Sequence, residues 1–253
     1  MTTPIVSVTD LRKRYGEIEA VRGISFTVAE GEVFGLLGPN GAGKTTTVEI
    51  LEGLRNADSG TASVAGIDVA RDPTGVKRRI GVQLQASAFP EHYTTKEVVE
   101  LFGIFYDRTV DALALLRQVD LADRASQRQE KLSGGQRQRL SIAVALVNEP
   151  RVIFLDEPTT GLDPQARRNL WALVQSIRDR GITVLLTTHY LDEAEVLCDR
   201  VAIIDEGRIV ALAPPRTLIA DLLGRGFTKP VLQQQANLED VFLDLTGHEL
   251  RED

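Results

Sequence analysis

Continuous apolar runs alternate with helical patterns along much of the chain. Residues 33–37, 152–155 and 183–186 have the apolar character of short strands that are buried on both faces. Between the second and third runs, apolar side chains recur at the spacing of a helix. These side chains are Leu170, Leu173, Val174 and Ile177. Buried strands that alternate with amphipathic helices predict a parallel sheet in an α/β core.

Strands of another kind flank this core in the sequence. Residues 5–8 and 23–28 alternate in the manner of strands on either side of a polar turn region. They predict a partly antiparallel β-layer near the N-terminus. Residues 201–204 and 208–210 surround an Asp-Glu-Gly turn at 205–207, and this pattern is typical of a β-hairpin.

The stretch from about 95 to 146 has a mostly helical pattern, with four apolar side chains expected on one face. These are Val98, Leu101, Phe102 and Phe105. We interpret this stretch as a helical lobe inserted into the core. After Pro214 the patterning is weak, apart from a helical stretch near 238–245. The predicted divisions are an α/β core at 1–90 and 147–220, a helical lobe at 91–146 and a tail at 221–253.

Composition narrows the class of protein. The net charge is −7 and the sequence pI is about 5.2, whereas binding to nucleic-acid phosphates usually requires a basic surface. We therefore expect no nucleic-acid partner. No apolar run approaches the ~18–20 residues that cross a bilayer, and the first residues lack a signal-peptide pattern. The single cysteine, Cys198, fits a reducing compartment. Together these features predict a cytoplasmic chain.

A glycine-rich stretch joins the apolar run at 33–37 to a helical pattern. Residues 38–45 match G-x-x-x-x-G-K-[ST], in which backbone N–H groups and a helix N-terminus surround phosphate oxygens. Lys44 is expected to reach the β- and γ-phosphates of ATP, and the Thr45 hydroxyl to bind Mg²⁺. The predicted ATP-binding residues of this loop are Gly38, Pro39, Asn40, Gly41, Ala42, Gly43, Lys44, Thr45 and Thr46.

Two neighbouring acids follow the apolar run at 152–155. Asp156 is expected at the carboxyl end of that strand, where α/β sheets bind ligands and where it can hold a hydrated Mg²⁺. Glu157 follows directly, placed to accept a proton from an attacking water molecule. Many strands end in an aspartate that merely forms a turn, so the inference depends on the glycine-rich loop upstream.

A second anion-binding nest precedes the last helix of the predicted lobe. Its sequence is Leu-Ser-Gly-Gly-Gln at residues 132–136, which also reads as an ordinary capped start of a helix. One chain does not need two phosphate nests for one nucleotide. This pentapeptide resembles the signature of the ABC-type ATPases, and the resemblance covers essentially the whole chain. It implies a P-loop NTPase (RecA-like) α/β core with an N-terminal antiparallel β-layer and an inserted α-helical lobe.

Other positions match the same family. Tyr15 lies where these ATPases place an aromatic that stacks on adenine, although a strand-edge tyrosine is the alternative. Gln85 matches the glutamine that joins Mg²⁺ and senses the γ-phosphate, and Gln83 is a competing candidate. Asp163 resembles the acid of a loop that crosses between subunits. His189 is similar to the switch histidine that contacts the γ-phosphate.

The resemblance implies hydrolysis of ATP to ADP and phosphate. The expected catalytic residues are Glu157, His189 and Lys44. The expected ligands of Mg²⁺ are Thr45, Gln85 and Asp156. In this family the signature residues complete the ATP site of a second subunit, which assigns that role to Ser133, Gly135 and Gln136. The resemblance thus implies a homodimer or a pair of homologous ATPase subunits, with dimerisation that depends on ATP.

The resemblance also implies a task at a membrane. We expect the chain to be peripheral at the cytoplasmic face, where it drives separate transmembrane permease subunits. Residues 86–95 are expected to grip that partner through Phe89 and Tyr93, which look exposed, although ordinary packing within the lobe is the alternative for these two aromatics. Residues 191–195 and 238–243 are similar to ATPases of exporters for drugs, antibiotics, lipids or polysaccharides. An importer ATPase is an alternative, and a soluble ABC protein acting on ribosomes or DNA is a more distant one. The transported substrate is not encoded in this chain.

Overall fold

The computed structural model describes residues 3–83 and 89–228. Contacts between residues divide the chain into a large unit, residues 1–218, and a small one, residues 219–253. In the described part of the small unit, the helix α8 (Pro215–Gly224) continues from the large unit and exposes the side chains of Leu222 and Leu223. No helix in the described part of the chain combines the length and the apolar character needed to span a bilayer.

A six-stranded sheet forms the centre of the large unit, in the order β10-β9-β3-β8-β7-β6. The strands from β9 to β6 pair in parallel, and β10 joins β9 as an antiparallel hairpin. This arrangement confirms the predicted parallel sheet and the predicted hairpin. The strands are β3 (Val33–Leu37), β6 (Ile80–Gln83), β7 (Val152–Asp156), β8 (Thr183–Thr188), β9 (Arg200–Asp205) and β10 (Arg208–Ala213).

A separate antiparallel sheet forms the predicted N-terminal layer, in the order β2-β1-β4-β5. Its strands are β1 (Val6–Tyr15), β2 (Ile18–Val28), β4 (Ser59–Val64) and β5 (Ile67–Asp68). The first two strands are longer than the sequence pattern suggests. The rings of Phe26 in β2 and Phe34 in β3 stack with centroids 5.2 Å apart, so the two sheets share one apolar core.

Helices cover both faces of the central sheet. Successive residues of β3 point to opposite faces, so Phe34 and Leu36 pack with the helix α1 (Lys44–Leu51), while Val33 and Leu37 pack in the cluster of the opposite face. That opposite cluster contains the helices α6 (Pro164–Asp179) and α7 (Leu191–Leu197). The buried residues of α6 are the four that its helical spacing predicted.

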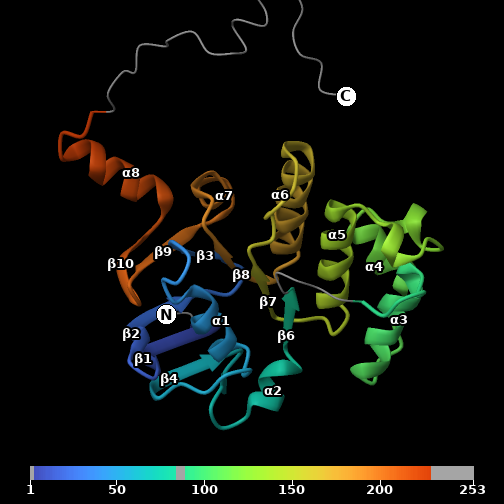
Figure 1. The fold of residues 1–253 in the computed structure, drawn as a ribbon, viewed down its shortest axis with the longest axis horizontal. Coiled ribbons are helices and arrows are strands. Elements are labelled where there is room, and N and C mark those ends of the chain that lie inside the picture. Colours follow the sequence, from blue (N-terminus) through green and yellow to red (C-terminus); the bar gives the residue numbers. More distant parts are fainter. Residues whose placement is uncertain (1–2, 84–88, 229–253) are drawn as a thin grey trace, which may run out of the picture. The chain divides into compact units, whose positions relative to one another are not determined.

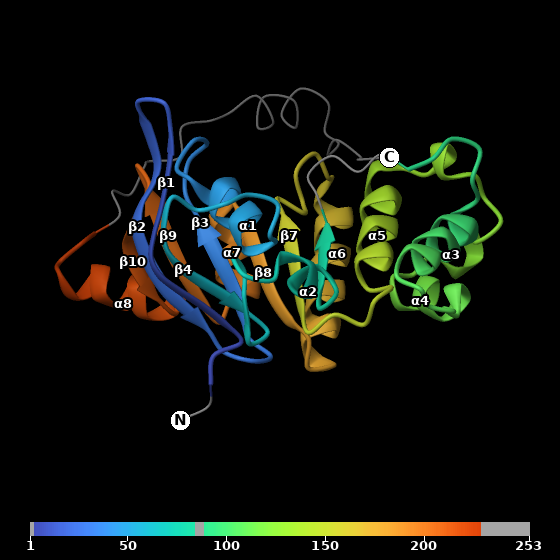
Figure 2. The ribbon, with the colours of Figure 1, turned by 90° about the horizontal axis from the view of Figure 1, so that it is seen from below.

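Three helices lie between β6 and β7 in the chain. They are α3 (Thr95–Phe105), α4 (Ala112–Gln118) and α5 (Gly134–Ala145), with short 3-10 turns at Ala122–Arg124 and Gln129–Lys131. The short helix α2 (Pro73–Lys77) precedes β6. Figures 1 and 2 show α3, α4 and α5 gathered beside β6 and α6, on the side away from the antiparallel sheet.

One residue of the predicted apolar face of α3 does not lie in the core. Val98 is fully buried, but Phe105, the last residue of the helix, is 66 % exposed. A reciprocal capping box between Thr94 and Glu97 fixes the first turn at the opposite end of this helix. The exact division into core, lobe and tail remains a prediction.

Candidate functional site

The loop after β3 curls around the ammonium group of its own lysine. Lys44 Nζ donates to the carbonyl oxygens of Gly38 and Pro39 over 2.8 Å and 3.1 Å, and the side chain is 5 % exposed. Gly43, just before α1, has φ 102°, and a Cβ there would lie 2.3 Å from the Ala20 carbonyl oxygen. Only glycine fits this position, so the tight path of the loop requires a glycine at residue 43.

The rest of the loop and the start of α1 present their groups outward. Pro39, Asn40 and Gly41 are exposed, as is Thr45 on the first turn of the helix. The N-cap of α1 is Gly43, so no side chain of the N-cap residue binds the backbone N–H groups of this turn. Those N–H groups lack partners within the helix, so they are suited to receive an anion.

Asp156 and Glu157 emerge at the same sheet edge as the end of β8. Thr187, which is fully buried in β8, donates its hydroxyl hydrogen bond to Asp156 Oδ1. The same hydroxyl accepts the backbone N–H of Glu157 over 3.1 Å. The Thr187 carbonyl also accepts that N–H, over 3.1 Å. One threonine therefore fixes both acids.

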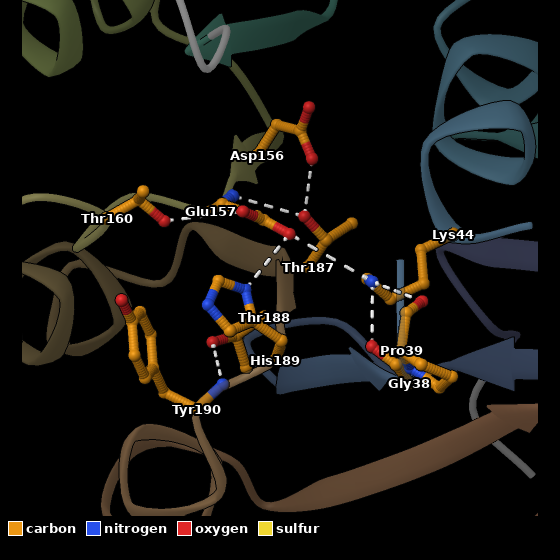
Figure 3. A network of polar contacts seen from close by, with 10 residues as sticks. All are labelled: Gly38, Pro39, Lys44, Asp156, Glu157, Thr160, Thr187, Thr188, His189 and Tyr190. Carbon is orange, nitrogen blue, oxygen red and sulfur yellow. Dashed lines mark hydrogen bonds and ion pairs between the residues drawn. The ribbon is translucent and has the colours of Figure 1, made fainter. Parts of the chain in front are cut away.

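Glu157 stands between the loop lysine and His189, as Figure 3 shows. Its Oε1 lies 4.0 Å from Lys44 Nζ and 3.2 Å from His189 Nδ1, and its Oε2 accepts a 3.3 Å hydrogen bond from Thr160. Glu157 also has φ 47°, in the left-handed region that a side chain rarely adopts outside glycine. Such strain costs about 1–3 kcal/mol and is concentrated at functional sites.

Burial has the largest effect on the pKa values of Lys44 and Asp156. Desolvation lowers the pKa of Lys44, although the nearby Glu157 and Asp156 act in the opposite direction. Desolvation likewise raises the pKa of Asp156, and the hydrogen bond from Thr187 partly offsets it. Both groups therefore sit in a site that penalises their charged forms, and an added anion beside Lys44 or cation beside Asp156 would relieve that penalty.

Tyr15 lies at the end of β1 with 39 % of its surface exposed. Its ring is flanked by cations: Lys13 Nζ is 5.6 Å and Arg55 Cζ 5.4 Å from the ring centroid. Lys13 is in turn paired with Asp58 over 2.7 Å. The ring is thus held at the surface rather than packed into the core.

The signature residues start α5. Ser133 is exposed at the N-cap, and it exchanges hydrogen bonds with Gln136 in a capping box, with distances of 3.0 Å and 3.3 Å. Ser133, Gly135, Gln136 and Asp163 line one cavity of about 210 Å³. The structure therefore brings the signature next to the Asp163 loop. A cavity of about 440 Å³ lies elsewhere, between the start of α4 and residues 146–150, and the site residues do not line it.

Three predicted features lie partly or wholly outside the described residues. Gln85 is outside the described residues, and so are residues 86–88 of the segment 86–95 that is expected to contact a membrane partner. The predicted helical stretch near 238–245, with the exporter-like segment 238–243, also lies outside them. Within that segment, Phe89 is half-buried and packs edge-on against Phe102, with centroids 6.4 Å apart, so its expected exposure is wrong. Tyr93 is 39 % exposed, as expected.

Sequence reasoning overlooked Thr187 and Thr160. Both hydroxyls hold the acids that the pattern did identify. A signal for Thr187 was present, because it lies two residues before His189 at the end of a buried strand. Polar residues at the carboxyl ends of neighbouring parallel strands meet at one edge of a sheet.

Known proteins are similar to this chain in sequence and in fold. The sequence pattern of the ABC transporter family matches residues 21–160, which is more than half of the chain. The Nod factor export ATP-binding protein I of Burkholderia lata is 38 % identical, with 98 % of each chain covered. The daunorubicin resistance ATP-binding protein DrrA2 of Streptomyces coeruleorubidus is 44 % identical over 91 % of this chain and 73 % of its own.

Solved structures agree with the sequence relatives. The ATP-binding cassette MJ0796, in a dimeric post-hydrolysis state bound to ADP and phosphate, superposes with a TM-score of 0.74 and is 29 % identical, covering 83 % of this chain and 99 % of its own. The protein cbiO1 of Clostridium perfringens, part of the ABC transporter complex cbiONQ, has a TM-score of 0.78 at 28 % identity, covering 86 % and 91 %. The chain therefore belongs to the ABC transporter family, has the P-loop NTPase fold, and is an ATP-binding and ATP-hydrolysing subunit.

Proposed function

We propose that this chain hydrolyses ATP to power export through separate membrane subunits. Support for export comes from its relatives: one over nearly its whole length is named as a Nod factor export protein, and another as a daunorubicin resistance protein. Export is thereby favoured over import. We assign recognition of the transported substrate to the membrane subunits.

The observation that carries the hydrolytic role is the strained Glu157 between Lys44 and His189. A water oxygen attacks the γ-phosphorus, the bond from that phosphorus to the bridging oxygen breaks, and its electron pair leaves with ADP. Glu157 accepts the proton that the water loses. Lys44 stabilises the charge on the phosphate oxygens, and His189 orients the γ-phosphate.

Nucleotide binding uses the exposed groups around this centre. We assign the loop residues 38–46 to the phosphates, with the backbone N–H groups at the start of α1 as donors. Tyr15 is assigned to stacking on adenine, because its ring is partly exposed at the surface, with Lys13 and Arg55 beside it.

The donor set fits a magnesium ion. Thr45 supplies an exposed hydroxyl and Asp156 a carboxylate, and Mg²⁺ prefers oxygen ligands. Only Oδ1 of Asp156 accepts a hydrogen bond within the described residues, which leaves Oδ2 for a cation. Gln85 remains a candidate third ligand. When bound, Mg²⁺ neutralises negative charge on the phosphate oxygens.

A second copy or a homologous ATPase subunit would complete each ATP site. We assign Ser133, Gly135 and Gln136 to the nucleotide of that partner. In support, Ser133 is exposed at the N-terminus of a 12-residue helix, beside the Asp163 loop, and the similar cassette MJ0796 is described as a dimer. The neighbouring membrane subunits would place the chain at the cytoplasmic face of a membrane.

Purification from membranes tests the export proposal. An affinity-tagged chain, solubilised with mild detergent from its own cells, is expected to carry along a membrane protein with several spanning helices. Co-purification of an extracellular solute-binding protein with that complex would point to import instead. Recovery with ribosomes or DNA, and with no membrane protein, would overturn the transporter role while leaving the ATPase activity untouched.

A further inference from the structure

The helix α6 contacts the segment that carries His189. Tyr190 follows this histidine directly, and the two rings contact each other with centroids 4.1 Å apart. The guanidinium carbon of Arg167, in α6, lies 4.7 Å from the centroid of the Tyr190 ring. Arg167 Nη1 also pairs with Asp192 Oδ2 over 3.5 Å, although both groups are partly solvated. Arg167 of α6 therefore contacts both the residue that follows the histidine and the start of α7.

A buried carboxyl makes the second contact between these elements. Glu193, in the first turn of α7, is 0 % exposed, and its Oε1 accepts a 3.3 Å hydrogen bond from Trp171 Nε1. Trp171 lies four residues after Arg167, so both side chains project from the same face of α6. A glutamate is rarely buried so completely without a counter-charge, and such a group usually has a function.

Glu193 also faces the loop that follows Glu157. Its Oε2 and the Oγ1 of Thr159 are both buried and have no hydrogen-bond partner among the described residues. Burial raises the pKa of Glu193, and the neighbouring Thr188, Thr159 and Trp171 have a smaller effect in the opposite direction. Burial thus favours the uncharged acid, whose O–H is able to donate to Thr159.

The three contacts converge on one residue of the candidate site. Thr188 and Tyr190 are the neighbours of His189 in the chain, and Thr188 Oγ1 accepts the Tyr190 N–H over 3.0 Å. Figure 3 shows this short turn holding the imidazole toward Glu157. The His189 Nδ1 to Glu157 Oε1 distance of 3.2 Å leaves little tolerance, because a shift of about 1 Å would break the contact.

We propose that Glu193, Trp171 and Arg167 are positioning residues that hold the His189 turn against Glu157 during ATP hydrolysis. This role rests on the proposed function, in which His189 orients the γ-phosphate. None of the three touches the nucleotide in this scheme. Arg167 acts through its contact with Tyr190. Trp171 and Glu193 act through the first turn of α7.

A purely structural role is the competing explanation, since the same contacts also fix α7 to α6. The two explanations differ in what they predict for kinetics. Loss of stability alone would lower the amount of folded enzyme, whereas mispositioning of His189 lowers kcat in enzyme that is fully folded. The chain offers a matched control on the same helix: Arg178 pairs with Asp199 over 2.7 Å, near the other end of α6.

The test is a double-mutant cycle with His189→Ala, measured on full-length protein by phosphate release and by the Kd for a fluorescent ATP analogue. Glu193→Leu and Trp171→Phe are each expected to reduce kcat about tenfold or more, with little change in Kd. Glu193→Gln should recover most of kcat, because its amide accepts from Trp171 and donates to Thr159. Arg178→Ala should match the wild type in kcat.

In the His189→Ala background the same substitutions should reduce kcat less than about twofold further, because the residue that they position is gone. Effects that multiply in the double variant would overturn the proposal, as would wild-type kcat in Trp171→Phe. If Glu193→Leu does not fold, Trp171→Phe and Arg167→Lys, which removes the planar stacking group, decide the matter. If His189→Ala alone keeps wild-type kcat, the role proposed for His189 fails, whatever the outcome at Glu193.

Discussion

The stability of the apo protein should depend on pH through Glu52. This residue caps the C-terminus of α1, is 2 % exposed, and has its pKa raised to about 8 by burial and then by Asp156 and Glu49. The ordinary glutamate value is near 4.5. Between these two values the folded state binds a proton more tightly than the unfolded state. Raising the pH through this window therefore lowers the free energy of unfolding.

The size of this effect follows from the two pKa values. With 4.5 in the unfolded chain and about 8 in the folded protein, the Glu52 carboxyl costs about 1 kcal/mol of stability at pH 5 and about 4 kcal/mol at pH 8. Glu52→Gln has no such pH-dependent cost. For a protein of this size, a difference of about 3 kcal/mol corresponds to about 6–12 °C in Tm.

Thermal unfolding in EDTA at pH 5 and pH 8 measures this difference. The Tm of Glu52→Gln minus that of the wild type should increase by about 10 °C between the two pH values. Glu195→Gln, at an exposed position of α7, controls for the removal of a carboxylate from the surface. A Tm difference that stays constant, within about 2 °C, from pH 5 to pH 8 would refute the reasoning.

Three further substitutions probe the site. Lys44→Ala should raise the Kd for ATP at least about tenfold, because it removes the cation held by the Gly38 and Pro39 carbonyls; titration with a fluorescent analogue measures it. Thr187→Val should lower kcat about tenfold and Tm by several degrees, since it removes the hydroxyl that fixes both acids. Steady-state kinetics and calorimetry measure these two changes, and a variant with unchanged kcat and Tm would contradict this role. Tyr15→Ala should weaken ATP binding several-fold but leave binding of inorganic triphosphate unchanged, and equal losses for both ligands would exclude adenine stacking.

Much of the fold could be read from apolar periodicity. The buried strands β3, β7 and β8 and the apolar face of α6 are where the pattern predicted them, because continuous burial leaves a strong sequence signal. The C-terminal end of α3 was misjudged at Phe105. Helical spacing identifies a face but does not show where the helix leaves the core.

The site was predicted as residue types at expected places, without their geometry. The pattern identified Glu157 as an acid after a strand, but the left-handed backbone that aims it at Lys44 and His189 depends on Thr187, 30 residues later in the sequence. Glu193 gave no signal either, because a glutamate in the first turn of a helix usually faces solvent. Its burial arises only when α6 and α7 pack together. The assigned roles of these residues remain proposals.

One measurement tests the central claim most directly: the mass of the Glu157→Gln variant in solution with Mg²⁺ and ATP, recorded with phosphate release. The amide keeps the shape of the carboxyl but cannot accept the proton from water. We predict a particle of twice the monomer mass that forms only with ATP, and a rate of phosphate release lowered by a factor of about 10²–10⁴. A variant that binds ATP yet stays monomeric, or that releases phosphate at the wild-type rate, would contradict the account.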